Sequence, residues 1–173
     1  MSPQELSCAL RKDHGPYLKA RRWVVSLALF NVAAMGAISL FQIGILKHVP
    51  EVRLPGADAD KINGSAQAYE ILQIPDAFLA IGSYAATAAL AAMGPPDRAR
   101  TLPWAALGMG IKTVADAALA VRLLISQPTK FKTYSAWCVA GALAALATAP
   151  IAWPEARAAW EQGHERRYDA EGG

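Results

Sequence analysis

The fold is decided by one stretch, Trp23-Val-Val-Ser-Leu-Ala-Leu-Phe-Asn-Val-Ala-Ala-Met-Gly-Ala-Ile-Ser-Leu-Phe-Gln-Ile-Gly-Ile-Leu46, which contains no ionisable side chain. About 20 apolar residues in a helix are enough to cross a hydrocarbon core of ~30 Å. The stretch is too long for the apolar region of a signal peptide, and it lacks a clean small-residue cleavage site. It therefore predicts an uncleaved membrane anchor.

Composition extends this prediction to most of the chain. Of the 173 residues, 54% are hydrophobic and 18% are charged, whereas soluble domains carry about 25% charged residues. Prolines mark the gaps between further apolar segments and the end of the last one, at Pro154. We therefore expect an all-α integral membrane protein, a bundle of four transmembrane helices with spans at 23–46, 77–93, 104–125 and 133–153. This 23–153 domain includes an outer loop (47–76), and it is flanked by an N-terminal segment (1–22) and a C-terminal tail (154–173).

Basic residues predict the orientation of these spans. Lys and Arg gather in 1–22, in the loop 95–103 and in the tail, whereas the loop 47–76 mixes acids with bases. Since short cytoplasmic loops are enriched in Lys and Arg, we expect both termini in the cytoplasm, in a multi-pass protein of the inner (plasma) membrane. The same rule explains the net charge of +3, so we expect no nucleic-acid partner. Three scattered histidines give no basis for a metal site.

Two short polar helices are expected outside the spans. Ser2-Pro3-Gln4-Glu5 has the pattern of a capping box with proline at the first helical position. This predicts a cytoplasmic surface helix that ends near residue 14. Residues 155–167 follow Pro154 and are expected to form a second, separate helix. Cys8 then lies on the cytoplasmic side and Cys138 on the outer side, so the two cysteines do not form a pair.

Polar residues inside the spans are costly and therefore informative. Lys112 and Asp116 lie one helical turn apart and can form an ion pair. This pair is either an internally neutralised structural contact or part of a polar cavity or proton path. In the first span, Asn31 and Gln42 are expected to form hydrogen bonds between helices.

The start of the last span carries the sequence Tyr134-Ser135-Ala136-Trp137-Cys138. It has the spacing of a C-x-x-C dithiol, with serine in place of the first cysteine. Two thiols at this spacing can exchange a disulfide with a partner, but a single thiol cannot close that intramolecular cycle. The motif is therefore a working redox site, a disabled one, or a chance spacing.

A second stretch, Ser65-Ala-Gln-Ala-Tyr-Glu-Ile-Leu-Gln-Ile-Pro-Asp-Ala-Phe-Leu-Ala-Ile-Gly82, resembles bacterial members of the vitamin K epoxide reductase family. These members carry a serine, then an Ile-Pro that enters the second span, then small residues and glycine. Ser-Ala-Trp-Cys occupies the place of that family's C-x-x-C at the outer start of the fourth span. The resemblance covers roughly residues 23–153 and implies four helices around a quinone, either ubiquinone or menaquinone.

The resemblance also implies roles for individual residues. Cys138 corresponds to the cysteine nearest the quinone, Ser135 to the cysteine that faces the thiol partner, and Ser65 to the loop serine. Asp76 lies close to the polar residue that hydrogen-bonds a quinone carbonyl, although it is equally suited to cap the helix after Pro75. Tyr134, Trp137 and Tyr84 are expected to line the pocket. Besides membrane lipid, the implied partner is a thioredoxin-like thiol protein on the outer side.

The chain departs from the family at two places. Ser135 removes one redox thiol, and the loop 47–75 contains no cysteine, where many members have a second pair. Cys138 could still form a mixed disulfide with a partner or an adduct with the quinone. Ser135 is either the residue of a diverged member that no longer turns over or a replacement that traps an intermediate.

Three functions follow from these observations. The first is a quinone-linked membrane thiol oxidoreductase. The second is a non-catalytic membrane subunit or quinone-binding scaffold that retains the fold. The third is a small transporter or proton path that uses Lys112 and Asp116.

Overall fold

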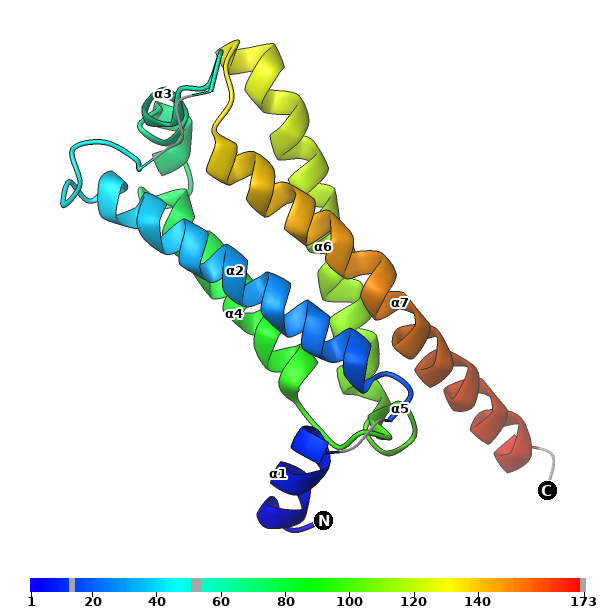
Figure 1. Cartoon of the computed structure of the whole chain (residues 1–173). Coiled ribbons are helices and arrows are strands. Elements are labelled where there is room, and N and C mark those ends of the chain that lie inside the picture. Colours follow the sequence, from blue (N-terminus) through cyan, green and yellow to red (C-terminus); the bar gives the residue numbers. More distant parts are fainter. Residues whose placement is uncertain (13–14, 51–53, 172–173) are drawn as a thin grey trace.

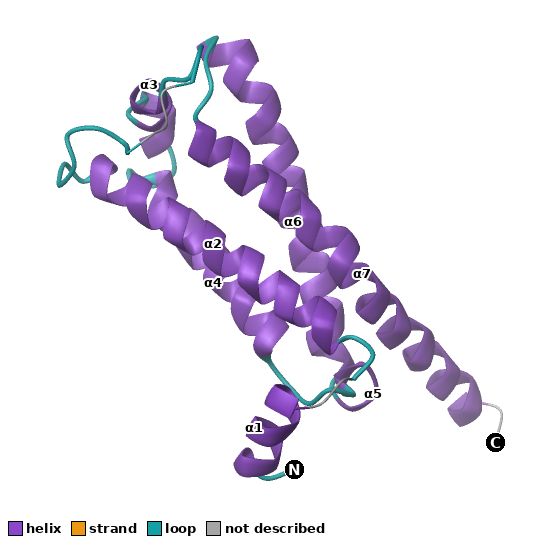
Figure 2. Cartoon of the chain, viewed as in Figure 1, coloured by secondary structure: helices purple, strands orange, loops and turns teal. Residues whose placement is uncertain are grey.

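The computed structural model describes residues 1–12, 15–50 and 54–171, with side chains described as far as residue 165. The described residues form helices and loops and no strand (Figure 2). The long helices are α2 (Leu18–Gln42), α4 (Asp76–Ala92), α6 (Pro103–Ser126) and α7 (Ala136–Glu171). The short ones are α1 (Pro3–Lys12), α3 (Ala59–Asn63), η1 (Ala66–Tyr69), α5 (Arg98–Thr101) and η2 (Gln127–Phe131).

The long helices pack as two pairs. α2 lies along α4, α6 lies along α7, and α2 also contacts α7 (Figure 1). α3 and the start of α7 lie at one end of the bundle, which we call the Cys138 end. α1, α5 and both chain termini lie toward the other end, which we call the Arg98 end (Figure 1). Cys8 on α1 and Cys138 on α7 are therefore far apart, as expected for two cysteines that do not form a pair.

Among the described residues, two helices are long and apolar enough to cross a membrane, α2 and the part of α7 from Ala136 to Glu165. α4 is apolar but shorter. α2 begins at Leu18, before the uncharged stretch 23–46, and it ends at Gln42, before the last residues of that stretch. The chain leaves the helix at Gly44, which has a φ of +81°, a conformation that glycine adopts without steric strain. Four spans thus remain a prediction, to which we return below.

The N-terminal capping box is confirmed. The backbone N–H of Ser2 donates to Glu5 Oε2 at 2.7 Å, and the backbone N–H of Glu5 donates to Ser2 Oγ at 3.3 Å. These reciprocal bonds satisfy two donors at the start of α1. The expected end of this helix, near residue 14, lies outside the described residues.

The prediction of a separate helix after Pro154 is wrong, because α7 continues through Pro150 and Pro154 to Glu171. Proline lacks the N–H that would bond to the carbonyl four residues earlier, so each proline removes one bond from the helix. Glu155 points inward and is only 1% exposed, where it pairs with Arg98 at 2.8 Å. This contact holds the turn after Pro154 against the bundle.

Two buried arginines converge on the end of α4. Arg21 of α2 is 2% exposed. Its Nε donates to the carbonyl of Ala91 at 2.9 Å, and its Nη atoms donate to the carbonyls of residues 92–95 at 2.8–3.2 Å. The last carbonyls of a helix have no partner within the helix and carry partial negative charge. Arg21 thus caps the C-terminus of α4.

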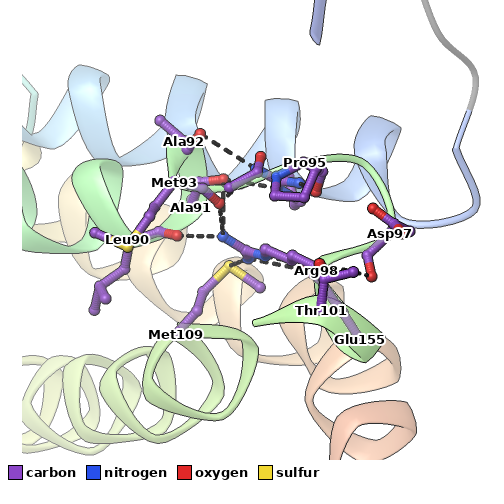
Figure 3. A network of polar contacts seen from close by, with 12 residues as sticks. Leu90, Ala91, Ala92, Met93, Pro95, Asp97, Arg98, Thr101, Met109 and Glu155 are labelled. Carbon is purple, nitrogen blue, oxygen red and sulfur yellow. Dashed lines mark hydrogen bonds and ion pairs between the residues drawn. The ribbon is translucent and has the colours of Figure 1, made fainter. Parts of the chain in front are cut away.

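Arg98 completes this cluster from α5 (Figure 3). Its Nε and Nη2 donate to the two carboxylate oxygens of Glu155 at 2.8 and 2.9 Å, which is bidentate pairing. Its Nη1 donates to the carbonyls of Leu90 and Met93, and Nη2 also contacts Met109 Sδ at 3.1 Å. Arg98 thereby joins α4, α6 and α7 through one side chain. The sequence analysis used the basic residues of the loop 95–103 only to predict the orientation of the spans, so it missed this structural role.

We predict that Glu155→Gln lowers the free energy of unfolding by about 3–5 kcal/mol, because it leaves Arg98 charged, buried and without its carboxylate partner. Denaturation of the protein in detergent micelles measures this loss. Glu161→Gln is the matched control, because its pair with Arg157 has side chains that are 55% and 68% exposed. An exposed pair contributes about 0–1 kcal/mol. Equal losses in the two variants would contradict a structural role for the buried pair.

Candidate functional site

Ser135 and Cys138 lie in the first turn of α7. Ser135 directly precedes the first helical residue, Ala136, and its Oγ accepts a hydrogen bond from the backbone N–H of Cys138 at 3.4 Å. This is the position and the contact of a helix N-cap. Serine therefore has a structural role at this position, in addition to occupying the place of a thiol. Ser135 is 0% exposed and Cys138 is 6% exposed.

The helix terminus affects the chemistry of Cys138. The N-terminal end of a helix carries partial positive charge, which favours the thiolate over the thiol. Burial among apolar side chains acts in the opposite direction. Cys138 is part of a buried cluster with Ile38, Val49, Ala59 and Ala77, against which Met35, Phe41 and Trp137 pack. The sulfur thus lies where α2, α3, α4 and α7 meet.

One polar contact of Cys138 was not predicted from the sequence. Its Sγ lies 3.5 Å from Oδ1 of Asn63, the last residue of α3. The Nδ2 of Asn63 donates to the carbonyl of Ala59 at 2.8 Å, so the orientation of the amide is fixed within α3. The thiol can therefore donate a hydrogen bond to an oriented acceptor. Nothing in the local sequence Asn63-Gly64-Ser65 indicates this contact.

Gln42 connects the helices around this site. Its Nε2 donates to Asp76 Oδ1 at 2.7 Å and to the carbonyl of Asn63 at 3.1 Å, and its Oε1 accepts from the backbone N–H of Ala77 at 3.3 Å. The hydroxyl of Tyr69 donates to the backbone carbonyl of Gln42 at 2.9 Å. The predicted role of Gln42 as an interhelical hydrogen-bonding residue is confirmed. Asp76 is the first residue of α4, with its carboxylate held by Gln42 of α2.

The loop between α2 and α4 is fastened to the start of α7. The Trp137 ring N–H donates to the carbonyl of Pro50, and the Tyr134 hydroxyl donates to the carbonyl of Pro55 at 3.1 Å. The backbone carbonyl of Tyr134 accepts from the N–H of Asp58 at 2.9 Å, and Thr133 Oγ1 donates to the carbonyl of Gly56 at 2.7 Å. The described part of this loop therefore covers the Cys138 end.

Within this loop, Asp60 holds the segment that follows α2. Its carboxylate accepts from the backbone N–H of Val49 and contacts His48 Nδ1, both at 2.7 Å. Partial burial acts to raise the pKa of Asp60, but these two hydrogen bonds and the attraction to His48 keep the pKa below its usual value. These contacts thus favour the ionised carboxylate.

Two of the predicted site residues, Ser65 and Tyr84, are not part of the buried cluster around Cys138. Ser65 is half-buried at the start of η1, with Asn63 occupying the place beside Cys138. Tyr84 of α4 packs against a separate cluster of Ala120, Ala142 and Ala145.

Tyr134 lines an open groove of about 590 Å³ between α6 and α7. Gln127 and Val139, the residue after Cys138, also line this groove. The Oε1 of Gln127 accepts from the backbone N–H of Ser135 at 3.0 Å.

Lys112 and Asp116 form the predicted ion pair within α6, and Ser83 and Thr87 connect the pair to α4. Lys112 Nζ donates to Asp116 Oδ1 and to Ser83 Oγ, the latter at 2.8 Å, and Thr87 Oγ1 donates to Asp116 Oδ2 at 2.7 Å. Asp116 is 5% exposed, so its carboxylate is enclosed by these partners. This arrangement favours the structural interpretation of the pair over the transporter hypothesis.

We predict that Gln42→Leu increases the rate at which a membrane-permeant maleimide alkylates Cys138. The change removes the Gln42 hydrogen bonds to the Asp76 carboxylate, the N–H of Ala77 and the carbonyl of Asn63, and a buried polar group that loses its partner costs about 1–3 kcal/mol. The loop then opens more often. Alkylation is measured by mass spectrometry in a Cys8→Ser background, in which Cys138 is the remaining cysteine.

Gln67→Leu is the matched control, since Gln67 is exposed on η1. It is expected to leave the alkylation rate unchanged. If both glutamine variants react at the wild-type rate, Gln42 does not control access to Cys138.

The chain is similar to a known protein family. The profile of the vitamin K epoxide reductase family matches residues 22–153, a region that begins in the first turns of α2, includes α4 and α6, and ends at Trp153 of α7. No curated protein and no solved structure matches the chain. Because the family profile covers most of the sequence, the chain belongs to the vitamin K epoxide reductase family of membrane proteins.

Proposed function

We propose that this protein is a quinone-linked membrane thiol oxidoreductase in which Cys138 is the thiol nearest the quinone. The observation that carries the proposal is the placement of Cys138 in the first turn of α7, inside an apolar cluster and beneath a fastened loop. Family membership makes thiol oxidation the expected chemistry. Ser135 occupies the position of the second thiol.

The residues around Cys138 fit a quinone. A quinone ring has two apolar faces, and its carbonyl oxygens lie at the ring edge. Met35, Ile38, Phe41 and Trp137 offer apolar and aromatic surface beside the sulfur, while Gln42 and Asp76 offer polar groups near one end of this surface. Such a mostly apolar site with a few oriented polar groups is typical of cofactor binding.

The protein residues have defined tasks in this chemistry. A bound quinone supplies an acceptor for two electrons and two protons, which a pair of thiols releases when it forms a disulfide. The start of α7 places partial positive charge beside the Cys138 sulfur, and Asn63 Oδ1 orients the thiol. With serine at position 135, Cys138 can form a disulfide bond with a partner thiol but not within its own motif.

The proposed membrane setting has four spans with both termini in the cytoplasm of a cell with an inner (plasma) membrane. Trp23, Trp104 and Trp153 are 56–57% exposed and come from α2, α6 and α7 near the Arg98 end. Tryptophan is enriched at membrane–water interfaces, so these side chains support an interface at that end. Ile111, Leu119 and Ile125 of α6 are 59–73% exposed, which suits contact with lipid.

The redox partner would be a thioredoxin-like thiol protein on the outer side. Because Cys138 is 6% exposed, we expect the loop over it to open before a protein thiol reaches the sulfur. The alternative function is a non-catalytic quinone-binding scaffold. The enclosed N-cap role of Ser135 favours this alternative, because serine is well satisfied there without any redox task.

Ser135→Cys tests the proposal directly. We predict that this variant forms an intramolecular disulfide with Cys138 and reduces quinone at the expense of an added dithiol, whereas the wild-type protein forms no such disulfide. Mass spectrometry under non-reducing conditions detects the disulfide, and the quinone absorbance follows the reduction. The control is Ala136→Cys, which adds a thiol at the wrong spacing and is expected to remain inactive.

A Ser135→Cys protein that binds quinone but exchanges no disulfide with a dithiol would refute the enzymatic function. The scaffold function would then be the better description of the protein.

A further inference from the structure

A groove lies at the Arg98 end of the bundle, away from Cys138. It has a volume of about 290 Å³ and lies between α1, the start of α2 and the end of α4. Its apolar walls are Leu10, Leu18, Val25, Ala91 and Ala92, and its polar side chains are Arg21, Arg22 and Ser26. The groove therefore combines an apolar lining with two guanidinium groups, and the redox chemistry proposed above assigns no task to it.

Arg21 gives the groove a positive charge. Its hydrogen bonds go to backbone carbonyls, which carry no net charge. The carboxylate of the same cluster, Glu155, is held by both of its oxygens to Arg98. Among the described residues, the cluster of Arg21, Arg98 and Glu155 thus keeps an excess positive charge next to the groove.

Arg22 adds a second charge at the rim. It is exposed, and its Nη2 donates to the backbone carbonyl of Leu10 at 2.7 Å, which holds the end of α1 against α2. α2 contains no Asp or Glu, and Lys19 adds a further exposed base to its first turn. The charge at the start of α2 is therefore not neutralised within the helix, and the groove favours an anion.

The position of the groove relative to the bilayer indicates which anion. Trp23 follows Arg22 and is 56% exposed, as suits a membrane–water interface. Basic pockets between membrane helices on the cytoplasmic side bind the head groups of anionic lipids. The apolar walls below the arginines match the acyl chain that is attached to such a head group.

We propose that this groove binds one anionic phospholipid. The phosphate lies beside Arg21 and Arg22, and the first part of one acyl chain lies along Val25 and Ala92, while the rest of the lipid stays in the bilayer. This inference goes beyond the redox function and does not depend on it. The assignment to the cytoplasmic leaflet follows from the proposed orientation of the termini.

The test is native mass spectrometry of the full-length protein in detergent, titrated with dioleoylphosphatidylglycerol or dioleoylphosphatidylcholine. We expect the wild-type protein to bind the anionic lipid roughly 10-fold more tightly. Arg22→Gln should weaken binding of the anionic lipid about 3- to 10-fold, because it removes one charge at the rim. Arg22→Lys keeps the charge and should retain most of the affinity. Val25→Trp should weaken binding of the anionic lipid by filling the groove.

Two variants serve as matched controls. Arg122→Gln removes an exposed charge from α6 near the Cys138 end. Leu29→Trp adds the same bulk as Val25→Trp, one turn farther along α2 at a side chain that is 54% exposed and does not line the groove. Both controls should bind the anionic lipid with the wild-type affinity.

Selective loss in Arg22→Gln and Val25→Trp, with both controls unchanged, supports the inference. Equal affinity of the wild-type protein for the two lipids would overturn it, and so would wild-type affinity in Arg22→Gln. An equal loss in Arg122→Gln would show diffuse attraction in place of a site. Displacement of the lipid by an equal concentration of inorganic phosphate would show a phosphate site and overturn the lipid as occupant. Each of these results leaves the proposed quinone chemistry at Cys138 untouched.

Discussion

A polar group inside a bilayer has no water to bond, so it needs a partner within the protein or from a ligand. Three clusters of buried polar side chains meet this requirement in the described structure. Arg21, Arg98 and Glu155 close the Arg98 end, Lys112 and Asp116 join α4 to α6, and Gln42 holds the Cys138 end. Each cluster connects helices that contribute mostly small apolar residues to the core. The polar contacts thus define how the helices are aligned.

The same constraint acts at both ends of α4. At the Arg98 end, the arginines satisfy the carbonyls that end α4, and at the Cys138 end Gln42 fixes the start of the same helix. Because α4 is held at both ends, the apolar surface between α2 and α7 has a defined shape beside Cys138. The Asn31 amide, which the sequence predicted to bond to another helix, has no hydrogen-bond partner among the described residues, so that prediction is wrong.

Hydropathy and residue spacing predicted the apolar helices, the capping box and the Lys112–Asp116 pair, because these depend on residues close together in sequence. The redox half-motif at Ser135 and Cys138 was also visible in the sequence. The Arg98–Glu155 pair and the contact between Asn63 and Cys138 join residues 57 and 75 positions apart, and no local pattern indicates them. Pro154 predicted a helix end, but the buried bond of Glu155 to Arg98 favours a continuous helix.

The central claim is that the apolar surface beside Cys138 binds a quinone. Structure determination of the wild-type protein in lipid nanodiscs with a bound naphthoquinone or benzoquinone tests it most directly. The account predicts density for the ring in contact with Cys138, beside the apolar side chains that pack against it. Density for the ring at another surface, or side chains that fill this region while saturating quinone is present, would contradict it.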